Sequence, residues 1–397
     1  MSEHYALETH AVRTGIETDR QHGAVVPPLY LSSNYTFQDL AEPRQYDYTR
    51  SGNPTRDQLS QALCHLEGGE FGVVTSSGMA AISLVLQSLT PGSVVVAPHD
   101  CYGGTFRLLS LLDSRHQIHV EFINQTDPSA IEDVVAQFGE RIALFWVETP
   151  SNPLLRVTDL RFISSHARKI GATMAVDNTF LSPALQTPIK HGADIVVHST
   201  TKYLNGHSDV VGGAVVCRTA RQGEALAQWA NCLGITGAPF DAYQTLRGLR
   251  TLHARMRCHE ENTHRIAEVL AADERIARVY YPGLETDPGH EVAKRQQSGF
   301  GGMISFDVDD AQVDLRDFVR SLRLFSLAES LGGVESLVCH PATMTHAPMD
   351  EESKIAAGIG NNLVRLSVGI ENGDDLVRDI TAALRAASRV TTFAATA

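Results

Sequence analysis

Short apolar runs alternate with helical stretches between residues 72 and 217. Such runs, bounded by polar or turn-forming residues, are typical of strands buried on both faces of a sheet. The runs are Gly72–Val74, Val94–Ala97, Val120–Ile123, Ile142–Glu148, Met174–Asp177, Ile195–His198 and Ala214–Cys217. The helical stretches are Met79–Leu89, Thr105–Leu112, Ile131–Phe138 and Leu160–Ile170. The alternation predicts an α/β fold with a mostly parallel sheet covered by helices, and ligands bind such sheets at the carboxyl ends of their strands.

The remainder of the 397-residue chain divides into an arm and a C-terminal region. Residues 1–62 are poor in regular pattern and contain several prolines, so we expect an arm that lies across a neighbouring subunit. Residues 63–255 make up the predicted sheet domain. A long helical stretch, Phe240–Val269, leads into residues 256–397. There, strands near 279–281, 302–306 and 363–368 and helices near 315–322 and 375–387 predict a smaller α+β domain.

Composition excludes several classes of protein. The net charge is −13, which does not favour binding to nucleic acid. No apolar run has transmembrane length, and the first residues lack the pattern of a signal peptide. The six cysteines show no Cys-x-x-Cys spacing and the 17 histidines no His-Glu-x-x-His spacing, which argues against disulfides and against a metal site. We therefore expect a cytoplasmic protein that uses no metal.

The stretch from His198 to His207, His-Ser-Thr-Thr-Lys-Tyr-Leu-Asn-Gly-His, follows a buried strand run. It places Lys202 at a strand end beside the hydroxyls of Ser199 and Thr201. Burial disfavours the charged form of lysine and makes its amine available as a nucleophile towards an aldehyde. The two hydroxyls can donate to a phosphate. An aldehyde and a phosphate on one molecule describe pyridoxal 5′-phosphate (PLP), whereas the alternative is a surface lysine in a polar loop.

Two further strand ends support a PLP site. Asp177 ends an apolar run 25 residues before Lys202, about one strand–helix–strand unit away. A carboxylate there can keep the pyridine nitrogen of PLP protonated, so that the ring acts as an electron sink. Ser77-Gly78-Met79 joins a strand to a helix, and the N–H groups of such a helix N-terminus bind anions. The spacing matches neither a nucleoside-triphosphate loop nor a dinucleotide fingerprint, so a phosphate on a small cofactor is favoured.

With these motifs, the chain resembles the PLP-dependent transsulfuration enzymes of cysteine and methionine metabolism, and among them the cystathionine γ-synthases. The matching segments run in order over most of the chain, and together they are highly specific. They are 46–55 (Tyr-Asp-Tyr-Thr-Arg-Ser-Gly-Asn-Pro-Thr), 77–79, 100–107 (Asp-Cys-Tyr-Gly-Gly-Thr-Phe-Arg), 176–180, 198–207, 327–336 (Leu-Ala-Glu-Ser-Leu-Gly-Gly-Val-Glu-Ser) and 363–371. The resemblance implies a fold type I (aminotransferase-like) PLP enzyme, usually a homotetramer built from two active dimers.

The resemblance also implies residue roles. Catalysis falls to Lys202, Tyr102 and Asp177, with the ring of Tyr102 stacked on the cofactor. Tyr48 and Arg50 are expected to reach the cofactor phosphate of the neighbouring subunit. The full set of implied cofactor contacts is Tyr48, Arg50, Ser77, Gly78, Met79, Tyr102, Asp177, Ser199, Thr201 and Lys202. The implied substrate contacts are Asp47, Arg107, Glu329, Ser330 and Arg365.

Arg365 has an argument of its own, because it lies within an apolar strand run. A buried charge is costly unless it is paired. The partner that the family supplies is the carboxylate of the incoming amino acid, held by both arms of the guanidinium. The alternative is a structural ion pair with an aspartate or glutamate of the same chain.

The resemblance implies γ-replacement, in which L-cysteine displaces the acyloxy group of an O-acyl-L-homoserine to give L-cystathionine. We expect the O-succinyl ester, although the residues do not distinguish it from the acetyl or phosphate ester. Cystathionine γ-lyase activity is the nearest alternative, and an O-acylhomoserine sulfhydrylase comes next. Methionine γ-lyases and β-lyases are disfavoured, since the former usually have a cysteine shortly after the tyrosine and the latter an aromatic residue at the position of Glu329. A non-catalytic PLP-binding protein is a formal alternative, and the presence of Lys202, Asp177 and Arg365 argues against it.

Overall fold

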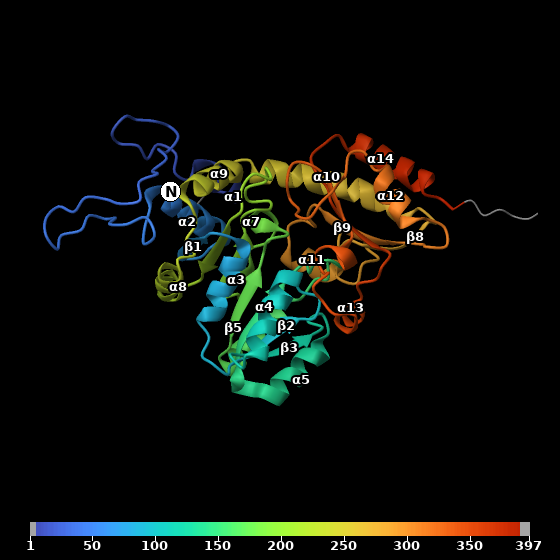
Figure 1. The fold of residues 1–397 in the computed structure, drawn as a ribbon, viewed down its shortest axis with the longest axis horizontal. Coiled ribbons are helices and arrows are strands. Elements are labelled where there is room, and N and C mark those ends of the chain that lie inside the picture. Colours follow the sequence, from blue (N-terminus) through green and yellow to red (C-terminus); the bar gives the residue numbers. More distant parts are fainter. Residues whose placement is uncertain (1–4, 390–397) are drawn as a thin grey trace, which may run out of the picture.

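The computed structural model describes residues 5–389, which form two sheets with helices packed around them (Figure 1). The larger sheet has seven strands in the order β1-β7-β6-β5-β4-β2-β3. Their bounds are β1 Phe71–Thr75, β2 Val94–Pro98, β3 His119–Ile123, β4 Ile142–Glu148, β5 Thr173–Asp177, β6 Ile195–Ser199 and β7 Gly213–Cys217. Each contains one of the seven predicted runs and extends it by at most a residue or two at an end.

Strand direction confirms the mostly parallel α/β sheet. The neighbours β3, β2, β4, β5 and β6 pair in parallel. Only β7 runs against its neighbours β1 and β6. The carboxyl ends of the parallel strands therefore lie along one edge, where side chains that follow them can converge.

Helices bury both faces of this sheet, which explains why its strands are apolar throughout. Helices α3, α4 and α8 cover one face, with α3 packed against β6 and β7. On the other face, α2 and α9 cover the β1 side and α5 and α6 the β4 side. The bounds are α2 Pro54–Glu67, α3 Gly78–Gln87, α4 Gly103–Ser114, α5 Pro128–Phe138, α6 Leu160–Ile170, α8 Ala220–Leu233 and α9 Pro239–Leu249.

The long helical stretch expected at 240–269 is two helices. Helix α9 ends at Leu249, and α10 (Leu252–Ala271) begins after a break at Arg250 and Thr251. The buried guanidinium of Arg255 donates to the Gly248 and Tyr203 carbonyl oxygens near this break. An apolar-periodicity pattern continues across so short an interruption, which is why the sequence indicated one helix.

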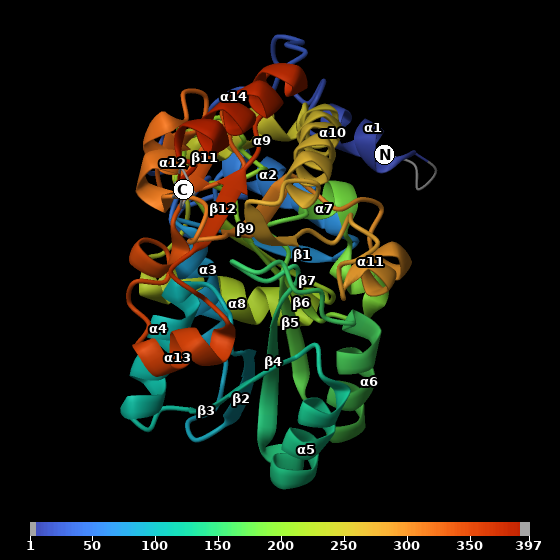
Figure 2. The ribbon, with the colours of Figure 1, turned by 90° about the vertical axis from the view of Figure 1, so that its right-hand side faces the viewer.

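The second sheet belongs to the C-terminal part of the chain and has the strand order β10-β11-β12-β9-β8. Helices α10, α12 and α14 pack on one of its faces. In Figure 2 its strands β9 and β12 lie above the larger sheet. The bounds are β8 Ile276–Tyr280, α11 His290–Gln296, β9 Met303–Val308, α12 Leu315–Ser321, β10 Ser326–Leu327, β11 Leu337–Cys339, α13 Glu351–Ala357, β12 Leu363–Ser367 and α14 Gly373–Ala386.

The N-terminal arm extends away from the rest of the chain (Figure 1). After helix α1 (Leu7–Arg13) it has no further helix until α2 begins at Pro54. Two of its stretches pair with each other through Tyr35 N–H to Asp47 O and Thr49 N–H to Ser33 O. Its apolar side chains include Leu31 and Leu40, which are 65% and 93% exposed. Such exposed apolar side chains are typical of a surface that another chain covers.

Candidate active site

A cavity of about 400 Å³ lies where the carboxyl ends of the larger sheet meet the second sheet. Strand ends of the larger sheet contribute one wall, and residues 329–331, Thr345 and Arg365 contribute the other. The predicted site residues that line it are Ser77, Gly78, Met79, Tyr102, Asp177, Ser199, Thr201, Lys202, Glu329, Ser330 and Arg365. The chain thus brings together eleven side chains or backbone positions that were singled out from six separate segments of sequence.

Lys202 lies in the turn after β6 and directs its amine into the cavity. The turn is closed by bonds from Lys202 N–H to Ser199 O and from Gly206 N–H to Lys202 O. Its Nζ donates to Ser330 Oγ at 2.8 Å. Burial, helped by the positive charge of Arg365, lowers the pKa of Lys202 to about 8. Near neutral pH the amine therefore reaches its nucleophilic form more readily than an exposed lysine.

Asp177 stands at the end of β5, adjacent to the strand that leads to Lys202. Its Oδ1 accepts a hydrogen bond from Thr179 N–H at 2.9 Å. Burial raises the pKa of Asp177, while the bonds from Thr179 and the charge of His198 act in the opposite direction. A carboxyl group held this way favours a cationic partner, which a protonated pyridine nitrogen provides. Sequence reasoning did not identify Thr179, whose hydroxyl also accepts from Ser199 N–H.

The N-terminus of α3 forms an anion site beside Lys202. Ser77 caps the helix by accepting from Ala80 N–H at 3.0 Å. The first N–H groups of the helix, at Gly78 and Met79, point out of its N-terminus, where donors lack partners within the helix. A Cβ atom on Gly78 would lie 2.8 Å from Ser199 Cβ, so only glycine allows this approach of helix and strand. With the hydroxyls of Ser199 and Thr201, these N–H groups match the donors that a phosphate requires.

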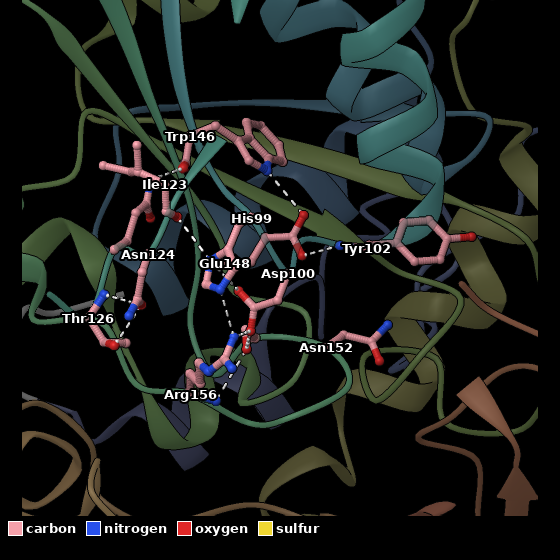
Figure 3. Close-up of polar contacts among 12 residues, drawn as sticks. His99, Asp100, Tyr102, Ile123, Asn124, Thr126, Trp146, Glu148, Asn152 and Arg156 are labelled. Atoms are coloured by element: carbon pink, nitrogen blue, oxygen red, sulfur yellow. Dashed lines mark hydrogen bonds and ion pairs between the residues drawn. The ribbon is translucent and has the colours of Figure 1, made fainter. Parts of the chain in front are cut away.

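Tyr102 precedes α4, and its ring lines the cavity (Figure 3). Burial raises the pKa of its hydroxyl, so the ring is uncharged at neutral pH. Its backbone N–H donates to Glu148 Oε2 at 2.7 Å. Sequence reasoning placed Glu148 at a strand end without assigning it a role, although an acidic residue that ends an apolar strand is the same signal that identified Asp177.

Arg365 is 2% exposed and lies on the cavity face of β12. Alternation along the strand explains this placement, because Val364 and Leu366 face the helices and Arg365 faces away from them. Its guanidinium donates to Asn152 Oδ1 at 2.8 Å and to Ser330 O at 3.1 Å, and no carboxylate among residues 5–389 pairs with it. The expected alternative, a structural ion pair, is therefore absent from the described part of the chain. A buried charge held by neutral groups is suited to an incoming carboxylate.

Ser330 links the two cationic groups. Its hydroxyl accepts from Lys202 and its carbonyl oxygen from Arg365. Its φ of 104° is a conformation that non-glycine residues rarely adopt. Strain of this kind persists where neighbouring contacts determine the backbone, and it is concentrated at functional sites.

Glu329 and Arg107 lie at the more exposed side of the site. Glu329 lines the cavity, is exposed, and forms no ion pair within residues 5–389. Its negative charge raises the pKa of Tyr102, and the charge of Arg107 lowers it, so both side chains lie near the ring. Arg107 is exposed and does not line the cavity.

Besides Arg107, three predicted residues lie outside this cavity. Asp47, Tyr48 and Arg50 belong to the arm, where Arg50 lies over the ring of Tyr48 at 5.6 Å. Asp47 accepts from Ser51 Oγ at 2.7 Å, and this bond lowers the pKa of the Asp47 carboxyl group. The chain that contributes Lys202 therefore does not bring its own arm residues into the cavity.

The residues present fit PLP. A cavity amine of lowered pKa suits its aldehyde, the α3 N-terminus suits its phosphate, and the Asp177 carboxylate suits its ring nitrogen. Within residues 5–389 there is no group of three or more His, Cys, Asp or Glu side chains that could hold a metal ion. Nor does any helix in that range have the length and apolar character needed to cross a membrane.

Comparison with known proteins agrees with this chemistry. Residues 8–385 match the family described as Cys/Met metabolism PLP-dependent enzyme. The chain is 52% identical to cystathionine gamma-synthase of Escherichia coli (strain K12) over 96% of this chain and 98% of that protein. It is 45% identical to cystathionine beta-lyase of Lactococcus lactis subsp. cremoris (strain MG1363), covering 96% and 99%. The crystal structure of cystathionine gamma synthase from Xanthomonas oryzae pv. oryzae in complex with cystathionine superposes with a TM-score of 0.94 at 56% identity, covering 96% and 98%. The chain belongs to the Cys/Met metabolism PLP-dependent enzymes, as its motifs predicted.

Proposed function

We propose that this enzyme catalyses γ-replacement on an O-acyl-L-homoserine, with L-cysteine as the incoming thiol and L-cystathionine as the product. The observation that carries the proposal is the charge layout of the cavity. Among the described residues 5–389, Arg365 offers a buried guanidinium without a carboxylate partner, and Glu329 offers an unpaired acid at the exposed side. The first suits the carboxylate of the homoserine ester, and the second suits the ammonium group of cysteine. The similarity to the synthases of E. coli and X. oryzae supports the same assignment.

In this proposal the chain positions the substrate and moves its protons. Arg365 binds the α-carboxylate and thereby fixes Cα near the amine of Lys202. That amine takes a proton from Cα and releases it before it takes a second proton from Cβ, after which the acyloxy group leaves Cγ as a carboxylate. The cysteine sulfur, as a thiolate, then bonds to Cγ, and the protons return to Cβ and Cα. When bound, PLP would supply the electron sink for the negative charge that develops at Cα, and Asp177 would keep its pyridine nitrogen protonated.

The arm makes the active unit at least a dimer in this proposal. Tyr48 and Arg50 lie outside the cavity of their own chain, and the arm exposes apolar side chains. We assign both residues to the phosphate of a second subunit, since Arg presents a planar fork of donors and Tyr a hydroxyl. A tetramer of two such dimers, acting in the cytoplasm, completes the proposal. All six cysteines are free, which suits a reducing compartment.

Subunit mixing tests the assignment of Arg50. Arg50→Ala and Lys202→Ala chains are each expected to be nearly inactive alone. When they are mixed in equal amounts, half of the dimers are hybrids, and each hybrid has one site that carries neither change. We expect recovery of up to about one quarter of wild-type activity after exchange. Differently tagged chains verify exchange. If hybrids form and activity does not return, Arg50 does not act across the subunit interface.

Product analysis tests the reaction itself. The enzyme is supplied with O-succinyl- or O-acetyl-L-homoserine, with L-cysteine, with sulfide or without a thiol, and separately with cystathionine alone, and products are identified by mass spectrometry. We expect cystathionine as the main product with cysteine, and slow formation of 2-oxobutyrate without it. Turnover of sulfide in preference to cysteine would favour the sulfhydrylase, and cleavage of cystathionine faster than its formation would favour a lyase.

The same assay with Glu329→Ala tests how cysteine is selected. A contact between the cysteine ammonium and a carboxylate is worth about 1.5–3 kcal/mol, and about 1.4 kcal/mol corresponds to a factor of ten. The apparent KM for cysteine should rise about tenfold or more, while the thiol-independent formation of 2-oxobutyrate changes much less. An equal loss in both reactions would mean that Glu329 serves their shared chemistry.

A further inference from the structure

Glu148 and Asp177 end neighbouring parallel strands and share a face of the sheet. Their Cα atoms are register partners between β4 and β5, and in parallel strands such partners point to the same side. Both line the cavity that contains Lys202. Glu148 is 5% exposed. Two carboxyl groups are thus placed next to each other behind the position where a cofactor ring would lie.

Hydrogen bonds fix the carboxyl group of Glu148 at both oxygens (Figure 3). Oε2 accepts from Tyr102 N–H at 2.7 Å, and Oε1 accepts from Trp146 Nε1–H at 3.1 Å. Trp146 lies on the same strand and is fully buried, so it provides a rigid reference. The bond from Tyr102 is the link between β4 and the start of α4. Glu148 therefore holds the backbone of the residue whose ring forms the cavity wall.

The charges around this pair are unequal. Around Glu148 lie Asp177 from β5 and the side chains of Cys101 and Tyr102 from the segment before α4. Around Asp177 lie Thr179, whose N–H donates to Asp177 Oδ1, and His198 from β6. Lys202 and Arg365 supply positive charge across the cavity.

Two carboxylates at the ends of adjacent strands repel each other, so a buried site disfavours the ionisation of both at neutral pH. Burial and the charge of Asp177 raise the pKa of Glu148 to about 8, against the hydrogen bonds from Tyr102 and Trp146. Burial also raises the pKa of Asp177, against the hydrogen bonding from Thr179 and the charge of His198. The pair therefore shares one proton and together carries a single negative charge.

We propose that Glu148 is a positioning residue that forms one functional unit with Asp177: the pair holds a single proton, and it releases that proton to solvent when a positively charged pyridine ring enters. One positive charge leaves as the proton when one positive charge arrives on the ring. The buried site therefore never holds two unpaired negative charges. Glu148 keeps Tyr102 in place in both states through its backbone bond. This inference rests on PLP as the cofactor and is independent of which substrate the enzyme uses.

PLP binding to the full-length chain, freed of cofactor, tests the proposal. Titration calorimetry in buffers of different ionisation enthalpy measures the protons released on binding. At pH 7 we expect wild type to release about one proton more than Glu148→Gln, because the amide cannot titrate. A group whose pKa of about 8 falls on binding makes affinity rise with pH. The wild-type Kd should thus fall up to about tenfold per pH unit from pH 6 to 8 and level off above, while the variant shows a flatter slope.

Two further variants separate this role from a structural one. Asp100→Asn is the matched control, because Asp100 is a buried carboxylate near the end of β2 that pairs with Arg156 at 3.1 Å and accepts from Ser151 (Figure 3). It should lower thermal stability yet keep the wild-type proton release. Glu148→Asp keeps a titrating group but shortens the reach to Tyr102, so it should weaken PLP binding and retain the pH slope. Equal proton release and equal slopes in wild type and Glu148→Gln, with both folded by circular dichroism, would overturn the proposal.

Discussion

Replacing Lys202 with arginine is expected to lower kcat by at least about a thousandfold. A side chain that acts as general acid and base contributes about 10²–10⁴-fold, and the same amine is the nucleophile for the cofactor aldehyde. Arginine preserves the positive charge and approximate size but stays protonated, so it can perform neither task. Steady-state kinetics measures the loss. Borohydride reduction of the wild-type enzyme, followed by peptide mapping, should place the cofactor label on Lys202.

Lys354 offers a matched control. It is also a buried lysine, 9% exposed, and its amine pairs with Glu351 at 3.1 Å in α13, away from the cavity. Lys354→Arg should retain most of the activity because arginine can keep that ion pair. Label on any lysine other than Lys202, or comparable losses in the two variants, would contradict the assignment.

Replacing Arg365 with leucine is expected to raise the KM for the homoserine ester about a hundredfold or more without lowering the stability of the protein. Two charged hydrogen bonds to a carboxylate, each worth about 1.5–3 kcal/mol, are lost, and about 1.4 kcal/mol corresponds to a factor of ten. The guanidinium has no carboxylate partner within residues 5–389, so its removal relieves a buried charge, and this offsets the loss of its hydrogen bonds to Asn152 and Ser330. Steady-state kinetics and thermal unfolding measure the two effects.

Arg255→Leu is the comparison variant, because Arg255 is a buried arginine with a structural role. It is 5% exposed, and burial lowers its pKa to about 10. It donates to the Tyr203 carbonyl oxygen at 2.8 Å and to that of Gly248 at 2.9 Å, which lose their donor in the variant. We expect a lower Tm in this variant and a smaller change in KM. If Arg365→Leu behaves in the same way, Arg365 is also structural.

The sequence predicted those parts of the site that depend on local order along the chain. Lys202 and Asp177 each follow an apolar run, and Gly78 opens a helix after one, so their strand ends were visible without the structure. Glu148 ends a run as well, but its function depends on lying beside Asp177, and strand neighbours are set by sheet order. Asn152 was missed because its partner Arg365 is 213 residues away.

The fold shows the same division between local and long-range information. Long, uniformly apolar strands such as β4 were predicted within a residue, because burial on both faces leaves a clear pattern. The strands β10 and β11 have two and three residues, too few for any periodicity to appear. Strand β11 forms by pairing with β12, a more distant segment, and β10 forms by pairing with β11.

Ser330 has a consequence for the range of substrates that the site can hold. It contacts Lys202 after β6 and Arg365 on β12, so a single residue sets the spacing between an amine of the larger sheet and a guanidinium of the second. The Cα and the carboxylate of any bound amino acid must match that spacing. The amino-acid end of the substrate is therefore held by two groups at a fixed separation. Variation among leaving groups and thiols is left to the exposed side near Glu329, where no such restraint is present among the described residues.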